Sequence, residues 1–334
     1  MESYRSLTAS NKPLLMIRSG QCGSVWGMAM LHRHRHHSVG VVIKREHAGP
    51  GRYLKNEATL QRQIFTAAWS LQFTSVPQCF DLVDHEDDER WRDLLLILPA
   101  GQGKCTTMIA ERITAVSRQA QMLLVKKYNW TPTRHRLMQK LESNAYYTHC
   151  LVHLYLGRRR PCSLGVPATR PEVFTLCNFP LHVDQMEELQ LPCPKYAKAM
   201  AESLAMLHWE MRLSGARVKF VLGGRRGATR MSASTPLAES TVWMFDFDRL
   251  RPIQANVSGL ISIARAFWRN SPYCPRPDST LWNIFADEYR RVGKEKVQAY
   301  PRHGECVETL CDLVDGALNM IVMGQKMWTI RGRF

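Results

Sequence analysis

The most informative absence in the 334-residue sequence is that of closely paired cysteines. Ten cysteines occur, but no two are spaced as C-x-x-C, and zinc ribbons and fingers need two such closely spaced ligand pairs. We therefore predict no structural zinc. His149, Cys150 and His153 lie close together on a predicted helix; buried free thiols are one interpretation of this group and a metal site is the other.

Long apolar segments are also lacking. No apolar run reaches the roughly 18 residues that a membrane-spanning helix requires. Residues 1–8 lack the apolar core of a secretory signal, and no internal repeat of fixed period occurs. These absences predict an intracellular protein, cytoplasmic or nuclear, with no membrane partner. The length allows one large domain or two moderate ones.

Negative charge is comparatively scarce. Lys and Arg number 45 against 29 Asp and Glu, a formal net charge of +16, which favours anionic partners such as nucleotides or nucleic acid. Basic clusters occur at 32–37, 158–160 and 223–227. None has the regular aromatic spacing of a base-stacking surface. A solvated basic surface is therefore favoured over a nucleic-acid groove, which remains an alternative.

The first third of the chain has the pattern of a strand-rich unit. A helical period follows at 53–65, with Leu54, Ala58, Ile64 and Phe65 on its buried side. An acidic stretch at 84–90 predicts a solvated loop. β-branched and apolar runs predict strands at 14–17, 24–31, 39–45, 79–83, 94–98 and 105–109.

The remainder predicts a mostly helical unit, so we divide the chain at 112/113. A loop at 223–240, rich in glycine and serine, is expected to be flexible. Paired strands are predicted at 217–222 and 241–247, and a further strand at 173–176. Helices are predicted at 114–128, 134–155, 194–208, 256–269, 279–292 and 305–323.

A strand that ends in an acid stands out at 242–249. Four apolar or aromatic residues lead into Asp246, and Asp248 follows two residues later. An acid exposed at the end of a buried strand is a common ligand for a metal ion. The alternative is that Asp246 forms an ion pair with Arg249 or Arg251.

Two further motifs precede this strand in the chain. Gly20 and Gly23 form a predicted hairpin that leads into Val25, which is either a phosphate-covering loop or an ordinary glycine turn. One strand later, Lys44 ends the run 41–44, and Glu57 lies on the next helix as its natural partner. Lys44 could equally be an ordinary lysine at the end of a strand.

In this order the motifs resemble protein kinases and aminoglycoside phosphotransferases. The resemblance implies an α+β, two-lobed protein-kinase-like fold, with a small antiparallel-sheet lobe before a larger helical lobe. It also implies that Gly20, Gly23, Val25, Lys44 and Glu57 hold ATP. Asp246 would bind Mg²⁺. Arg18 departs from the pattern because it stands where the first glycine of the loop belongs.

The catalytic loop of that superfamily has no counterpart. The pattern expects an aspartate and, five residues later, an asparagine just before a short apolar strand. Aligning 220–222 with that strand puts Gly215 and Phe220 at these two positions, and no acid occurs between Glu210 and Glu239. If the chain transfers phosphoryl groups, Glu210 or Asp184 would have to act as the catalytic base. We therefore assign no catalytic residue.

The chain is also similar to a fungal family of unknown function that is often labelled zinc-finger-protein-like. The similarity lies in residues 43–46 with 49–52, 154–160, 178–181, 184–187, 201–209, 245–248, 265–270 and 272–277. That family usually has an acid just before the strand at 218–222, where this chain has Ser214 to Arg217. Because that family has no agreed activity, the similarity does not predict a function.

Three functions are thus left open. The favoured one is a degenerate kinase-like protein that binds a nucleotide or a partner protein without efficient phosphoryl transfer. The second is an active ATP-dependent phosphotransferase with an atypical base. The third is a basic protein that binds nucleic acid through Arg225, Arg226 and the other arginine-rich segments.

Overall fold

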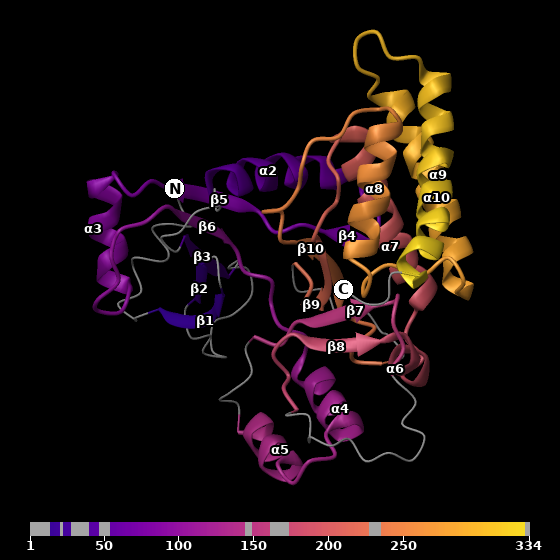
Figure 1. Ribbon diagram of the computed structural model, residues 1–334. Helices are drawn as coiled ribbons and strands as arrows, with labels where there is room; N and C mark the ends of the chain where they lie inside the picture. Colours follow the sequence, from indigo (N-terminus) through magenta and orange to yellow (C-terminus); the bar gives the residue numbers. More distant parts are fainter. Residues whose placement is uncertain are drawn as a thin grey trace.

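A computed structural model describes residues 14–20, 23–27, 40–46, 54–143, 149–160, 174–226 and 235–330. The basic cluster at 32–37 and residues 227–234 of the predicted flexible loop lie outside the described residues. Within the described ranges the fold is mixed α+β, with two five-stranded sheets and nine α-helices (Figure 1).

The first sheet is antiparallel and has the order β1-β2-β3-β6-β5. Helix α2 (Leu54–Ala67) packs on it through Leu54 and Ala58, which are buried as predicted, whereas Phe65 is only partly buried. The strands are β1 (Leu15–Gly20), β2 (Gly23–Gly27), β3 (Val41–Glu46), β5 (Cys79–Val83) and β6 (Thr107–Glu111).

The predicted strand at 94–98 is wrong, because this segment is the second half of helix α3 (Asp88–Ile97). Asp87 caps the helix by accepting a hydrogen bond from the Arg90 N–H. Trp91, Leu94 and Ile97 recur every three residues on the buried side. A continuous apolar run carries no period of its own, so the local pattern could not distinguish strand from helix.

The second sheet has the order β4-β10-β9-β7-β8. Strands β9 and β10 pair in antiparallel fashion, as predicted from the sequence. Strand β4, from the first third of the chain, pairs in parallel with β10 and so joins the second sheet. The strands are β4 (Thr74–Ser75), β7 (Val152–Tyr155), β8 (Phe179–His182), β9 (Lys219–Gly223) and β10 (Thr241–Phe245).

The predicted helix at 134–155 is also partly wrong. Helix α5 covers Arg134–Glu142, and β7 begins at Val152. Val152, His153 and Leu154 are all buried, so β7 lacks the alternation of burial that marks a half-exposed strand. Residues 174–176, in the other predicted strand, have no regular structure.

Helices cover the second sheet and form the largest core. Helix α7 buries the predicted stripe of Tyr196, Met200 and Leu204 and continues into a π-helix at Met206–Glu210. In Figure 1, α8, α9 and α10 stand side by side at the C-terminal end of the chain. The remaining helices are α4 (Arg118–Tyr128), α6 (Val183–Glu188), α7 (Cys193–Ala205), α8 (Val257–Arg269), α9 (Thr280–Ala299) and α10 (Val307–Ile330).

Two buried contacts outside the sheets join the early part of the chain to the second sheet's helices. The Glu202 carboxylate on α7 accepts the backbone N–H groups of Gln72 at 2.9 Å and Phe73 at 2.7 Å. These bonds fix the segment that leads into β4. No helix in the described part of the chain is long and apolar enough to span a bilayer.

Candidate functional site

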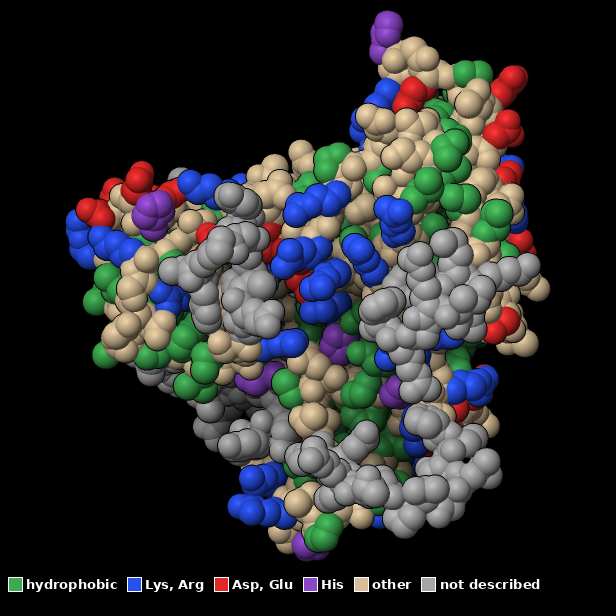
Figure 2. All heavy atoms as spheres, in the orientation of Figure 1, with side chains coloured by type: hydrophobic (Ala, Val, Ile, Leu, Met, Phe, Trp, Pro, Cys, Tyr) green, Lys and Arg blue, Asp and Glu red, His purple; other side chains and the backbone are tan. Residues whose placement is uncertain are grey.

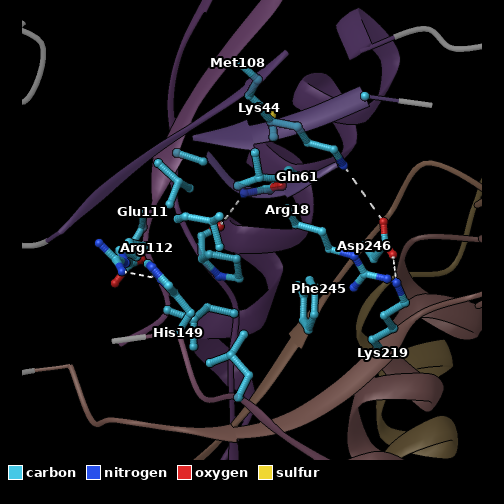
Figure 3. Close-up of a pocket in the computed structure, with 18 of the residues that line it drawn as sticks. Arg18, Lys44, Gln61, Met108, Glu111, Arg112, His149, Lys219, Phe245 and Asp246 are labelled. Atoms are coloured by element: carbon cyan, nitrogen blue, oxygen red, sulfur yellow. Dashed lines mark hydrogen bonds and ion pairs between the residues drawn. The ribbon is translucent and has the colours of Figure 1, made fainter. Parts of the chain in front are cut away.

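A pocket of about 390 Å³ opens where the two sheets meet (Figure 3). Strands β1, β2, β3 and β6 and helix α2 form one wall, and the ends of β9 and β10 form part of the other. The described lining residues are Ile17, Arg18, Gly23, Val25, Val42, Lys44, Glu57, Gln61, Pro77, Met108, Ala110, Glu111, Arg112, Ile113, His149, Leu151, Cys177, Asn178, Lys219, Phe245 and Asp246.

Lys44 and Glu57 form an ion pair inside this pocket. The Lys44 side chain is 15% exposed and that of Glu57 only 3%. Burial raises the pKa of the Glu57 carboxyl, and the Lys44 ammonium acts in the opposite direction. The pair joins β3 to α2, as the spacing in the sequence predicted.

Asp246 turns its carboxylate into the same pocket just beyond the end of β10. Its Oδ1 lies 3.9 Å from Lys44 Nζ, and its Oδ2 is paired with Lys219 Nζ. The backbone has φ of 74°, a left-handed conformation that side chains other than glycine adopt at a cost. Arg249, one of the predicted partners of Asp246, pairs instead with Asp248 at 3.5 Å.

The glycine hairpin borders the pocket from the side of the first sheet. Gly20 and Gly23 are register partners at the end of β1 and β2, and Gly23 and Val25 line the cavity. Arg18 on β1 extends across the opening towards Asp246 (Figure 3). The structure therefore brings Gly23, Val25, Lys44, Glu57 and Asp246 together around one cavity, with Gly20 at the adjoining end of β1.

The pocket is apolar in one part and charged in another. Val25, Val42, Met108 and Ala110 contribute aliphatic side chains from the first sheet. Phe245 lies on the opposite wall, next to Asp246 (Figure 3). Such a site suits a ligand that combines a flat apolar group with an anionic one.

A second polar group lies deeper between the sheets. Arg112 bonds through a guanidinium nitrogen to His149 Nδ1 at 2.7 Å, and both residues line the pocket. Burial, assisted by the charge of Arg112, lowers the pKa of His149 to about 4. The prediction that His149, Cys150 and His153 share a helix is wrong. His153 lies on β7, where its Nδ1 is 2.7 Å from the Tyr273 hydroxyl.

Sequence reasoning missed Lys219 as a pocket residue. The predicted alignment placed Phe220 at this point of the site, but Phe220 is 1% exposed and packs against Tyr273. Neighbouring residues of a strand face opposite sides, so Lys219 is the one that points to the cleft. The sequence feature that could have indicated this role is a lysine at the start of an apolar strand.

The residues considered as catalytic substitutes lie elsewhere. Glu210 pairs with Lys296 at 2.8 Å, and Asp184 accepts from Arg160 Nε at 2.6 Å. Neither lines the pocket. Gly215 has φ of 67° and its carbonyl accepts from Asn270, so it serves the local backbone.

Comparison with known families adds one finding. The model of a family described as DUF3669, zinc finger protein, matches residues 242–300. The matched segment holds Asp246, α8 and α9, but has one cysteine, Cys274, and no histidine. The four Cys or His ligands of a zinc finger cannot come from this segment alone. No curated protein sequence matches the chain.

Proposed function

We propose that the chain is a pseudokinase-like protein that binds a nucleotide such as ATP between its two sheets without efficient phosphoryl transfer. One observation carries this proposal. Lys44, Glu57 and Asp246 come from three separate elements and line one pocket beside the Gly20–Gly23 hairpin. The small antiparallel sheet with α2, followed by a larger and more helical part, supports the kinase-like, two-lobed arrangement.

The dimensions and chemistry of the pocket support a nucleotide as its ligand. A volume near 390 Å³ lies within the usual range for small-molecule sites. Apolar side chains such as Val25 and Met108 suit a base, while Lys44 and Lys219 provide charge for phosphates. The nucleotide would then span both sheets.

We infer inefficient phosphoryl transfer because no carboxylate in the described pocket lining is available as a catalytic base. Among the described lining residues the carboxylates are Glu57, Glu111 and Asp246, and each is already ion-paired. A base must be within reach of the hydroxyl that it activates. We therefore do not favour the active phosphotransferase, because neither Glu210 nor Asp184 is placed to act in the pocket.

Nucleic-acid binding is less favoured, because three arginines of two predicted basic clusters pair with acids of the protein itself. Arg159 pairs with Glu187, Arg160 with Asp184, and Arg226 with Glu111. Figure 2 shows further Lys and Arg side chains gathered in the middle of one face, which is compatible with an anionic small molecule.

Thermal unfolding with and without ATP tests the proposal. At 100 times its dissociation constant, a ligand that binds only the folded state adds about 2.7 kcal/mol of stability. Measurements are made both in excess Mg²⁺ and in EDTA. An unchanged melting temperature of the wild type under both conditions would refute nucleotide binding.

Lys44→Met is expected to remove the ATP-dependent shift. Lys55→Met is the matched control, because Lys55 pairs with Asp84 on the exposed surface and lies outside the pocket. Since Lys44→Met leaves Glu57 buried without its partner, the double variant Lys44→Met with Glu57→Gln keeps the site neutral. An intact ATP shift in a folded double variant would count against this pocket.

A further inference from the structure

The Mg²⁺ that the kinase resemblance implies does not fit the residues of the pocket. Mg²⁺ requires near-octahedral oxygen coordination at about 2.0–2.1 Å. Both carboxylate oxygens of Asp246 face ammonium groups, from Lys44 and Lys219. In the described ranges, no three His, Cys, Asp or Glu side chains are grouped so that they could hold a metal ion.

In place of a metal ion, the charged end of the pocket has cationic side chains. Lys219 reaches Asp246 from β9, Lys44 from β3, and Arg18 extends towards the same carboxylate from β1 (Figure 3). Three cationic side chains thus line the pocket together with two acids, Asp246 and Glu57. A divalent ion brought to this point would be repelled by the fixed charges.

One of these cations stands at a position where the chain departs from the kinase pattern, and another lies beside such a position. Arg18 replaces the first glycine of the loop, and Lys219 immediately precedes Phe220, which aligns with the metal-binding asparagine. Both residues add positive charge beside Asp246. Asp246 thereby acts as a positioning residue that holds Lys219 and Lys44 towards the cavity.

We propose that Lys219 and Arg18 replace the divalent cation, so that the pocket binds the phosphates of a metal-free nucleoside polyphosphate. This inference rests on the proposed nucleotide binding. It names the form of the ligand: free ATP rather than its magnesium complex. The magnesium complex carries two fewer negative charges, so it offers less to the three cations.

Calorimetric titration of the full chain with ATP distinguishes the two forms. We expect ATP in EDTA to bind at least as tightly as ATP in excess Mg²⁺. Binding that requires Mg²⁺ would overturn this inference and leave the proposed function standing. Failure to bind in either buffer would refute the proposed function itself.

Lys219→Asn gives the sharper test, because it removes one of the ammonium groups that pair with Asp246. Affinity for ATP in EDTA is expected to fall about tenfold or more, and added Mg²⁺ is expected to restore part of it. Lys198→Asn is the control, since Lys198 is exposed on α7, lies outside the pocket and loses the same charge.

Arg18→Gln provides a second variant, at an exposed position. It is expected to weaken binding in EDTA more than binding in Mg²⁺. Wild-type affinity for metal-free ATP in both the Lys219→Asn and Arg18→Gln variants would overturn the assignment.

Discussion

His208 shows how the core constrains a single ionisable side chain. Its ring is buried in the π-helix that follows α7, and Nδ1 lies 2.7 Å from the Tyr289 hydroxyl. That hydroxyl accepts a hydrogen bond from Trp209 Nε1 at 2.9 Å and can donate its own proton to Nδ1 of a neutral His208. Burial lowers the pKa of His208 to about 3.

This environment predicts an acid-sensitive fold. The unfolded chain binds a proton at His208 below about pH 6.5, but the folded chain does not until about pH 3. Stability is therefore full above pH 6.5 and falls as the pH drops towards 3, by about 1.4 kcal/mol per pH unit for each such histidine. His149 and His153, whose pKa values are lowered to about 4 by burial, add to the loss.

Urea unfolding between pH 6.5 and 4.5 measures this effect. In His208→Asn, the dependence of the unfolding free energy on pH should be shallower than in the wild type by about 1.4 kcal/mol per unit. His303→Asn, which changes an exposed histidine, should retain the wild-type slope. Equal slopes in the wild type and His208→Asn would show that His208 is not held neutral.

At the scale of elements, Arg226 fastens the end of β9 to the first sheet. Its guanidinium lies between the rings of Phe65 and Trp243, at 5.5 and 5.2 Å from their centroids. It pairs with Glu111 on β6 and donates to the Val76 carbonyl at 2.9 Å. The Glu111 side chain is 4% exposed, and its carboxylate accepts hydrogen bonds from this guanidinium.

Arg226→Ala should therefore lower the free energy of unfolding by about 2 kcal/mol, because Glu111 would be left buried and less well paired. The neighbouring Arg225 is exposed and offers a control with the same change of charge. Arg225→Ala should stay within about 0.5 kcal/mol of the wild type in the same denaturant titration. Similar losses in both variants would contradict the role of Arg226.

Elements with a clear period were predictable from sequence, and short segments without one were not. The stripe along α7 and the runs that form β9 and β10 each carry their own pattern. The segments 94–98 and 152–155 do not. Their structure is decided by the elements packed against them, which local spacing does not encode.

The residues of the candidate site also differ in whether the sequence predicts them. Lys44, Glu57 and Asp246 each sit in a recognisable local motif, so their meeting in one pocket could be anticipated. Lys219 becomes part of it only because the two sheets approach each other. A change of one residue in the alignment was enough to put buried Phe220 in the place of Lys219.

At the scale of the whole molecule, the two sheets share the pocket but are joined firmly away from it. Glu202 holds the backbone at Gln72 and Phe73, and β4 continues from there into the second sheet. A ligand in the pocket would add contacts between β3 and the β9–β10 pair. Bound ATP should thus protect residues on both sides at once.

Hydrogen exchange followed by mass spectrometry tests this expectation. With saturating ATP, backbone amides in β3 and α2 and in β9 and β10 should exchange more slowly, because opening either wall would release the ligand. Helices α9 and α10, which contribute no lining residue, should exchange as before and serve as the internal control. Protection of one sheet alone would mean that the nucleotide binds outside the shared pocket, since its lining comes from both walls.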